Sequence, residues 1–124
     1  MQMTAEVVEI NGMKYVPADS VQSEKAESVD GMEYVIVRTY SAGVHAGYMK
    51  DRNGKEVTLV RARRLWYWKG AATLSQLAME GVKNPEDCKF PCEVDSILLT
   101  EAIEVIPATA NAKTSIDGVK IWKR

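Results

Sequence analysis

Residues that bind metals or carry acid–base chemistry are scarce in this sequence. Its 124 residues include one histidine, His45, and two cysteines, Cys88 and Cys92. A structural zinc site normally takes four ligands, so we expect no metal centre and no cofactor. In a reducing compartment both cysteines are expected to be free thiols. A lone histidine with no nucleophile placed near it in the sequence also makes catalysis a weak interpretation, and we lean towards a protein that is not an enzyme.

Long apolar runs and a basic excess are missing as well. No stretch approaches the ~20 apolar residues that a membrane-spanning helix needs. The first residues, Met1–Glu6, show neither the basic nor the apolar segment of a secretion signal, so we expect a cytoplasmic protein without a membrane partner. The formal net charge of -1 excludes a globally basic nucleic-acid binder, but it leaves room for a local basic patch.

The length and the hydrophobic content, 46%, suit one folded domain with one core. Residues 6–17 hold two β-prone segments around Asn11-Gly12, the strongest short signal for a hairpin, since both central residues take positive φ. A polar stretch follows and predicts a linker. We therefore divide the chain into an N-terminal hairpin arm with its linker, residues 1–31, and a single α+β domain, residues 32–124.

Segments rich in β-branched and aromatic residues alternate with turn signals along this domain. They predict strands over Glu33–Tyr40, Val44–Lys50, Glu56–Leu65, Ile97–Ile106 and Val119–Trp122. The clearest helix is Ala71–Gly81, where Thr73 and Gln76 form a capping box. Asn84–Pro91 is expected as a loop, and Ala108–Ser115 as a loop or short turn. The elements predict an α+β fold with one helix and about five strands, either a small curled sheet, mixed or antiparallel, or an SH3-like barrel.

Charge is distributed unevenly along the near-neutral chain. The segment Lys50–Lys69 has a net charge of +5, whereas Gly70–Ala110 has a net charge of −5. Three interpretations stay open. The two halves pair their charges within one molecule, opposite faces meet between subunits of a homo-oligomer, or the basic half holds an anion.

The segment Arg61–Gly70 concentrates both cations and aromatic rings. Its cations are Arg61, Arg63, Arg64 and Lys69, and its rings are Trp66, Tyr67 and Trp68. Strand alternation places Trp66 and Trp68 on one face. Rings of this size are not left exposed on both faces, so one face enters the core and the other packs on a partner subunit or stacks on a ligand base. Guanidinium groups beside such rings suit a planar anion. The alternative is that Trp66 and Trp68 are core residues and the arginines form a solvated face.

The segment Arg38–Gly47 joins two predicted strands through small residues. Backbone N–H groups near Gly43 and the hydroxyl group of Ser41 are candidate anion donors, with Arg38 for a phosphate and Tyr40 for a stacked base. No Gly-Lys-Ser/Thr sequence follows, so this is not a phosphate-binding loop of the usual kind. The alternative is a tight turn that needs glycine. His45 could bind an anion when it is protonated or act as a general base, although catalysis is the weaker interpretation.

Five segments resemble a family of small phage and prophage proteins: Arg38–Gly47, Arg63–Trp68, Leu74–Ala78, Leu99–Ile106 and Ile121-Trp122. The resemblance covers residues 32–122 and leaves the N-terminal hairpin outside. It implies a viral accessory protein in the cytoplasm of a host cell, and it carries no established activity from which catalytic residues could be assigned. Several families of small phage proteins sequester cyclic or ADP-ribose-type nucleotide signals, and the likeness to those is one of context and charge.

The sequence thus predicts a homo-oligomeric phage counter-defence protein that binds and sequesters a nucleotide-like anionic small molecule. The candidate ligand-binding residues are Arg38, Tyr40, Ser41, Gly43, His45, Arg61, Arg63, Arg64, Trp66 and Trp68. A module that binds single-stranded or double-stranded nucleic acid with the same residues is the first alternative. A protein-interaction or structural module, in which the aromatic segment is an interface, is the second.

Overall fold

The structure is a computed structural model that describes residues 24–123. Its elements are β1 (Glu33–Thr39), β2 (Val44–Asn53), β3 (Glu56–Arg64), α2 (Leu74–Glu80), the 3₁₀ helix η1 (Pro85–Asp87), β4 (Glu93–Leu99), β5 (Ala102–Pro107) and α3 (Ala110–Asp117). The prediction of a small α+β fold is confirmed. The predicted N-terminal hairpin lies outside the described residues.

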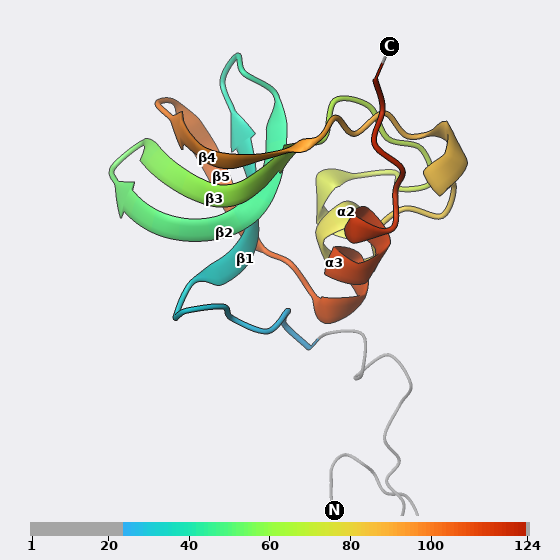
Figure 1. Ribbon diagram of the computed structural model, residues 1–124, viewed down its shortest axis with the longest axis horizontal. Helices are drawn as coiled ribbons and strands as arrows, with labels where there is room; N and C mark the ends of the chain where they lie inside the picture. The colour runs from blue at the N-terminus through green and yellow to red at the C-terminus, as the bar shows by residue number, and fades with distance from the viewer. Residues whose placement is uncertain (1–23, 124) are drawn as a thin grey trace, which may run out of the picture.

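The five strands form one sheet in the order β4-β3-β2-β1-β5, and all neighbouring strands are antiparallel. β4 and β5 lie at opposite edges of this sheet, although only Thr100 and Glu101 separate them in the sequence. The sheet therefore has to curl until its two edges approach at that end, as the strongly bent strands in Figure 1 show. The N–H of Ala102 donates to the carbonyl oxygen of Lys55, just before β3, over 2.9 Å.

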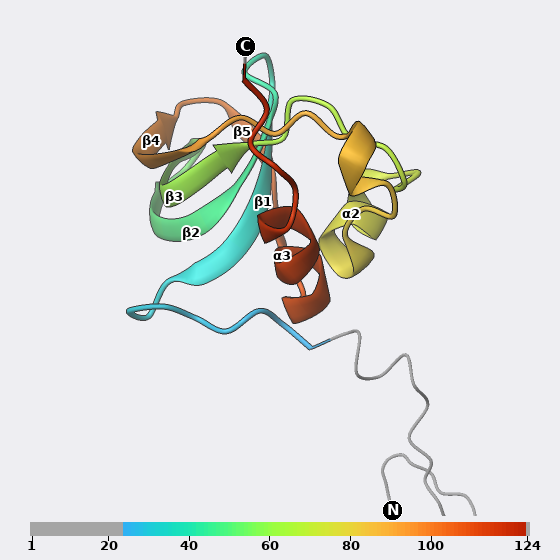
Figure 2. The same ribbon diagram turned by 45° about the vertical axis from the view of Figure 1, so that its right-hand side comes forward.

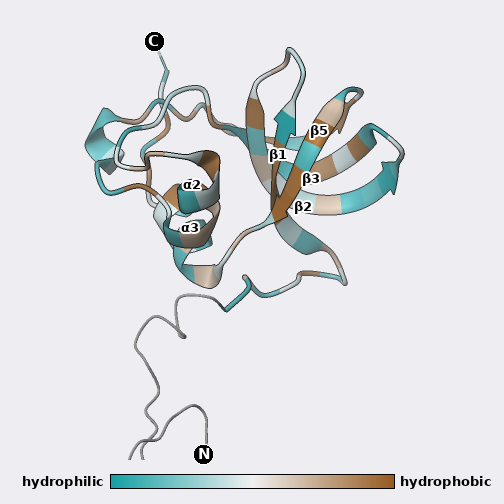
Figure 3. Cartoon of the chain, turned by 180° about the vertical axis from the view of Figure 1, so that it is seen from behind, coloured by the Kyte–Doolittle hydropathy of each residue, from teal (hydrophilic) through white to brown (hydrophobic). Residues whose placement is uncertain are grey.

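The inner strand β1 is buried on both faces, whereas the edge strands β4 and β5 are more exposed. Four consecutive residues of β1, from Tyr34 to Val37, are at most 4% exposed, which is typical of a strand covered on two sides. Val35 and Val37 belong to a cluster made by sheet residues alone. Tyr34 and Ile36 belong to a second cluster, which also holds residues of the two helices. Figure 3 shows the hydrophobic residues lying along the strands.

The helices α2 and α3 pack against each other beside the sheet (Figure 2). The predicted capping of α2 is confirmed, because the hydroxyl oxygen of Thr73 accepts from the N–H of Gln76 over 3.1 Å. Gly81 ends the helix with φ 79°, where a side chain would collide with Ser115. No described helix is long and apolar enough to cross a bilayer.

The prediction of one continuous strand over Ile97–Ile106 is wrong, because the chain turns at Thr100 and Glu101 between β4 and β5. The turn lacks glycine, proline and asparagine, the residues that usually mark one. Apolar residues continue on both sides of it, so the pattern resembles a single long strand.

Two predictions for the C-terminal part are also wrong. Ala108–Ser115 is not a loop or short turn, since α3 begins after Thr109, whose hydroxyl oxygen accepts from the N–H of Ala112 over 3.1 Å. Residues 24–123 thus contain two α-helices, where the sequence predicted one. Small polar residues hide the short apolar stripe of α3, in which only Ala112 and Ile116 are buried. Val119–Trp122 is not a strand of the sheet, because it forms a single parallel bridge, between Ile121 and Phe90.

Candidate ligand-binding site

A β-bulge in β3 sets the directions of the arginine side chains. Ala46 pairs with Arg63 and Tyr48 pairs with Val60, so two residues of β3, Arg61 and Ala62, face the single residue Gly47. Arg61 has φ 51°, a conformation that costs a non-glycine residue about 1 kcal/mol or more. A side chain at Gly47 would lie 3.0 Å from the Cα of Ala62, so glycine is needed opposite the bulge. The extra residue shifts the alternation and turns Arg63 inward.

Arg63 is 7% exposed and bonds only to backbone carbonyl oxygens in the described structure. Its guanidinium donates to Pro91 over 2.9 Å, to Ile116 over 2.8 Å, to Phe90 over 3.1 Å and to Val119 over 2.7 Å. The carbonyl of Ile116 belongs to the last turn of α3, where the helix dipole favours a cation. Burial lowers the pKa of Arg63 from its ordinary value. With four of its five N–H donors used inside the molecule, Arg63 holds the fold together.

Arg61 and Arg63 line one small pocket of about 350 Å³, whereas Arg38 is paired with a carboxylate of β5. The Nε of Arg38 is 2.8 Å from the Oε1 of Glu104 on β5. Arg61 lies over the ring of Tyr48, at 5.4 Å from its centroid, and its Nε is 3.9 Å from a carboxylate oxygen of Glu93. The structure therefore does not bring the four predicted arginines together on one surface.

Arg64 shares a pocket with several other predicted residues. This pocket, called the Arg64 pocket below, has a volume of about 420 Å³ and is lined by Ser41, Ala42, Gly43, Val44, Arg64, Leu65, Trp66 and Trp68. Ser41, Gly43, Trp66 and Trp68 are thus placed beside Arg64 as the sequence suggested. Tyr40 is 78% exposed and does not line the pocket. The predicted site is therefore reduced to one cation, two indole rings and one turn.

The turn between β1 and β2 is held by Thr39. Its hydroxyl oxygen accepts from the N–H of Ala42 over 2.8 Å and donates to the carbonyl oxygen of Gly43 over 2.8 Å. Gly43 has φ 88°, so the turn needs glycine, as the alternative interpretation expected. Thr39 itself is buried, which fixes the position of Ser41 and Gly43 at the mouth of the pocket.

His45 orients the side chain of Arg64 through a hydrogen bond. It is 1% exposed, and its Nε2 accepts from the Nε of Arg64 over 3.1 Å. Because Nε2 is the acceptor, Nδ1 carries the proton, and Nδ1 has no partner among the described residues. Burial, followed by the nearby charge of Arg64, lowers the pKa of His45 from 6.5 to about 4. His45 is therefore neutral near pH 7, and it supports the guanidinium without adding a second positive charge.

Trp66 forms a stack with a residue that the sequence analysis missed. Its ring and the ring of Trp122 are nearly parallel, at 4°, with centroids 5.1 Å apart. These two rings are called the indole pair below. The ammonium group of Lys89 lies 5.5 Å from the centroid of Trp66 and 5.7 Å from that of Trp122. Trp66 remains 58% exposed, so the pair is open to solvent. No local signal links Trp66 to Trp122, because only tertiary structure brings them together.

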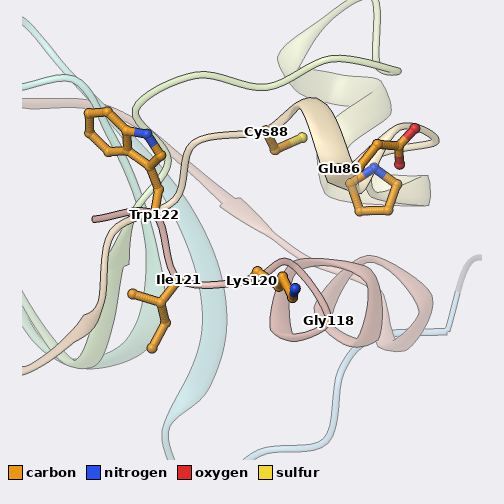
Figure 4. Close-up of a pocket in the computed structure, with 7 residues that line it drawn as sticks. Glu86, Cys88, Gly118, Lys120, Ile121 and Trp122 are labelled. Atoms are coloured by element: carbon orange, nitrogen blue, oxygen red, sulfur yellow. The ribbon is translucent and has the colours of Figure 1, made fainter. Parts of the chain in front are cut away.

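A second hollow adjoins the indole pair on the side of Trp122. This C-terminal pocket has a volume of about 590 Å³ and is lined by Pro85, Glu86, Cys88, Gly118, Lys120, Ile121 and Trp122. Figure 4 shows Trp122 and Ile121 at one end of it and Glu86 at the other. Burial raises the pKa of the Cys88 thiol, so Cys88 is not an activated nucleophile. Within residues 24–123, no three histidine, cysteine or acidic residues are grouped as metal ligands.

Comparison with known proteins gives a family but no activity. The model of a family described as "Domain of unknown function (DUF6948)" matches residues 32–116, which is more than half of the chain. No curated protein gives a significant match. No solved structure gives one either.

Proposed function

The chain belongs to this family of unknown function, and we propose that it binds a nucleotide-like anion in the Arg64 pocket. The observation that carries the proposal is the arrangement of one guanidinium group, two indole rings and the Ser41–Gly43 turn around a single hollow of about 420 Å³. A volume of this size is within the range of small-molecule sites. A phosphate and a planar base are the two chemical groups that this lining would bind.

Arg64 is the residue best placed to hold the phosphate. Its Nε is bonded to neutral His45, and its two terminal nitrogens have no hydrogen-bond partner among the described residues. Among the ion pairs of the described residues, none involves Arg64. A guanidinium fork that is already oriented loses little freedom when it binds a phosphate in a bidentate manner.

Trp66 and Trp68 are the residues best placed to contact the base. Trp66 is more than half exposed beside Arg64, while Trp68 is partly buried against the core and makes a firmer wall. Stacking of one base on an aromatic side chain contributes about 1–3 kcal/mol and does not depend strongly on the base. We therefore expect recognition of a phosphorylated nucleoside with limited selectivity between bases.

The side chains near the Arg64 pocket suit a protein that binds its ligand without converting it. His45 is neutral, has a lowered pKa and is bonded to Arg64, so it is a poor general base at pH 7. This supports the predicted sequestering protein more than an enzyme. The phage counter-defence role rests on the resemblance described above, and the proposed homo-oligomer rests on the uneven charge of the sequence.

The strand order supports a finer description of the fold, and we propose an SH3-like barrel. The last strand, β5, lies beside the first, β1, and a two-residue link connects it to the opposite edge strand, β4. Such a link favours closure over an open sheet. An experimental structure in which β4 and β5 diverge as a flat, open sheet would contradict this description.

A protein partner is a second candidate function, favoured by the exposed aromatic surface. Trp66 is 58% exposed, Tyr67 is 47% exposed and Ile121 is 56% exposed. Tryptophan and tyrosine often dominate protein interfaces. In this case Trp66→Ala would change the mass measured by size-exclusion chromatography with light scattering, and nucleotides would not bind at all.

Isothermal titration calorimetry with AMP, ADP-ribose and cyclic dinucleotides tests the nucleotide proposal. We expect Arg64→Gln to weaken binding of the best ligand by about 10- to 100-fold, the value of a charge-assisted hydrogen bond. Arg61→Gln is the matched control, because it removes the same charge from the same strand but outside the pocket. Equal losses for the two variants, or no binding of any ligand to the wild type, would overturn the proposal.

A further inference from the structure

The indole pair separates two pockets instead of closing one. Trp66 lines the Arg64 pocket, whereas Trp122 lines the C-terminal pocket. The two rings stack on each other with centroids 5.1 Å apart. Each ring therefore uses one face inside the pair and also lines a different pocket.

Backbone contacts hold the C-terminal half of this pair in place. The N–H of Trp122 donates to the carbonyl oxygen of Phe90 over 2.9 Å. The same carbonyl accepts from Arg63 over 3.1 Å, and Arg63 also bonds to Val119 over 2.7 Å. The ring of Trp122 thus extends from a segment that is anchored at Val119, through Arg63, and at Trp122, through the carbonyl of Phe90.

Lys89 leaves the outer faces of the indole pair uncovered. Its Nζ is almost equally distant from the two centroids, at 5.5 Å and 5.7 Å. A group that capped the outer face of one ring would lie much farther from the other, because the centroids are 5.1 Å apart. Lys89 therefore lies beside the stack, where its charge would face a linker passing from one pocket to the other.

Each pocket, and the indole pair between them, has one cation. Arg64 lines the first, Lys89 lies beside the pair, and Lys120 lines the second. Glu86 is the one carboxylate that lines the C-terminal pocket and opposes this charge. Proteins that bind single-stranded nucleic acid combine cations that contact the phosphates with aromatic rings that stack on the bases. The three cations and the two indole rings form such a combination.

We propose that the ligand carries two nucleobase-type rings joined by a phosphate-bearing linker, with one ring on Trp66 and the other on Trp122. This inference rests on the proposed function of the Arg64 pocket and extends it. The 5.1 Å between the indoles and two further ring contacts of about 4.5 Å each require a linker that spans roughly 14 Å. A mononucleotide is too short to reach both outer faces. A pyrophosphate-linked dinucleotide and a short single strand share the required chemistry.

Fluorescence titration separates these possibilities. The probes are AMP, diadenosine polyphosphates with increasing numbers of phosphates, and oligodeoxyadenylates of one to six nucleotides. We expect an abrupt gain in affinity of at least fivefold once the linker can span both rings. A gain among the diadenosine polyphosphates identifies a small dinucleotide, whereas a gain among the oligonucleotides alone identifies a single strand. Equal affinity for AMP and for every longer ligand overturns the two-ring proposal but leaves the Arg64 pocket standing.

Variants on the second pocket complete the test. Trp122→Leu should lower the affinity for the spanning ligand at least fivefold and change the affinity for AMP less than twofold. Lys120→Gln should weaken the spanning ligand alone, and it avoids any effect of Trp122 on folding. Lys50→Gln, on an exposed part of β2, is the matched control. A Lys120→Gln variant that binds the spanning ligand like the control would contradict the proposal. Failure of AMP and of all other probes to bind wild-type protein would instead count against the proposed function itself.

Discussion

Replacement of Arg63 should lower the free energy of unfolding more than replacement of Arg38, Arg61 or Arg64. The guanidinium donates four hydrogen bonds to carbonyl oxygens of Phe90, Pro91, Ile116 and Val119, and the residue is 7% exposed. A hydrogen bond to a charged group contributes about 1.5–3 kcal/mol, and the contributions are not additive. Removing the buried charge recovers part of its desolvation energy. We therefore expect Arg63→Met to lower the free energy of unfolding by about 3–5 kcal/mol, a large share of the 5–15 kcal/mol typical of a domain.

Arg63→Lys distinguishes the hydrogen-bonding fork from the charge alone. Lysine keeps the positive charge but cannot reach four carbonyl oxygens that surround a planar guanidinium. We expect it to lose at least about 2 kcal/mol as well. Urea unfolding followed by tryptophan fluorescence measures both variants, and an unchanged m-value would show that the states compared are the same.

Arg61→Met is the matched control for this series. Arg61 is exposed and its contact with Glu93 is long, at 3.9 Å, so the loss should be within about 0.5 kcal/mol. The melting temperature of Arg63→Met should fall by at least about 10 °C, while that of the control should barely change. An Arg63→Lys variant within about 1 kcal/mol of the wild type would refute the reasoning, because the four bonds would then be replaceable by a point charge.

Three further predictions concern neighbouring groups. The pKa of His45 is about 4 in the folded protein and 6.5 in the unfolded chain, so the unfolded chain takes up the proton first as the pH falls. The contribution of His45 to the free energy of unfolding should be complete above about pH 6.5 and should fall by up to about 3 kcal/mol towards pH 4. Urea unfolding of His45→Gln should no longer show this pH dependence. Gly47→Ala should destabilise by about 1–3 kcal/mol through contact with Ala62, whereas Gly118→Ala, where a side chain has more room, should not, as judged by thermal melting. Glu86→Gln should tighten binding of a ligand that enters the C-terminal pocket and leave AMP unaffected in the same titration, and weaker binding would show that the carboxylate is itself a ligand contact.

Much of the fold was predictable because its signals are local. The first three strands and the capped start of α2 are encoded by β-branched runs, Asn53-Gly54 and the pair Thr73 and Gln76. The turn between β4 and β5 was not, because Thr100 and Glu101 carry no turn preference of their own. Its position depends on closure of the curled sheet, which is a property of all five strands together.

The candidate site was predictable only where neighbours in sequence remain neighbours in space. Arg64, Trp66 and Trp68 share a pocket because they lie on one short segment, and the Ser41–Gly43 turn reaches it through the pairing of β2 with β3. Arg63 belongs to the same segment, but the bulge at Arg61 turns it into the interior. Trp122 comes from the far end of the chain, so no pattern near Trp66 could have indicated it.

The extra residue in β3 also constrains how this protein can change in length. Side chains of a strand alternate with a period of two, so removing one residue between Val60 and Leu65 would exchange the inner and outer sets beyond that point. The guanidinium that anchors α3 would then face water, and Arg64 would face the core. Many substitutions at Arg61 should be tolerated, whereas deletion of one residue there should abolish folding. The number of residues in this part of β3 therefore matters more to the fold than the identity of the residue at position 61.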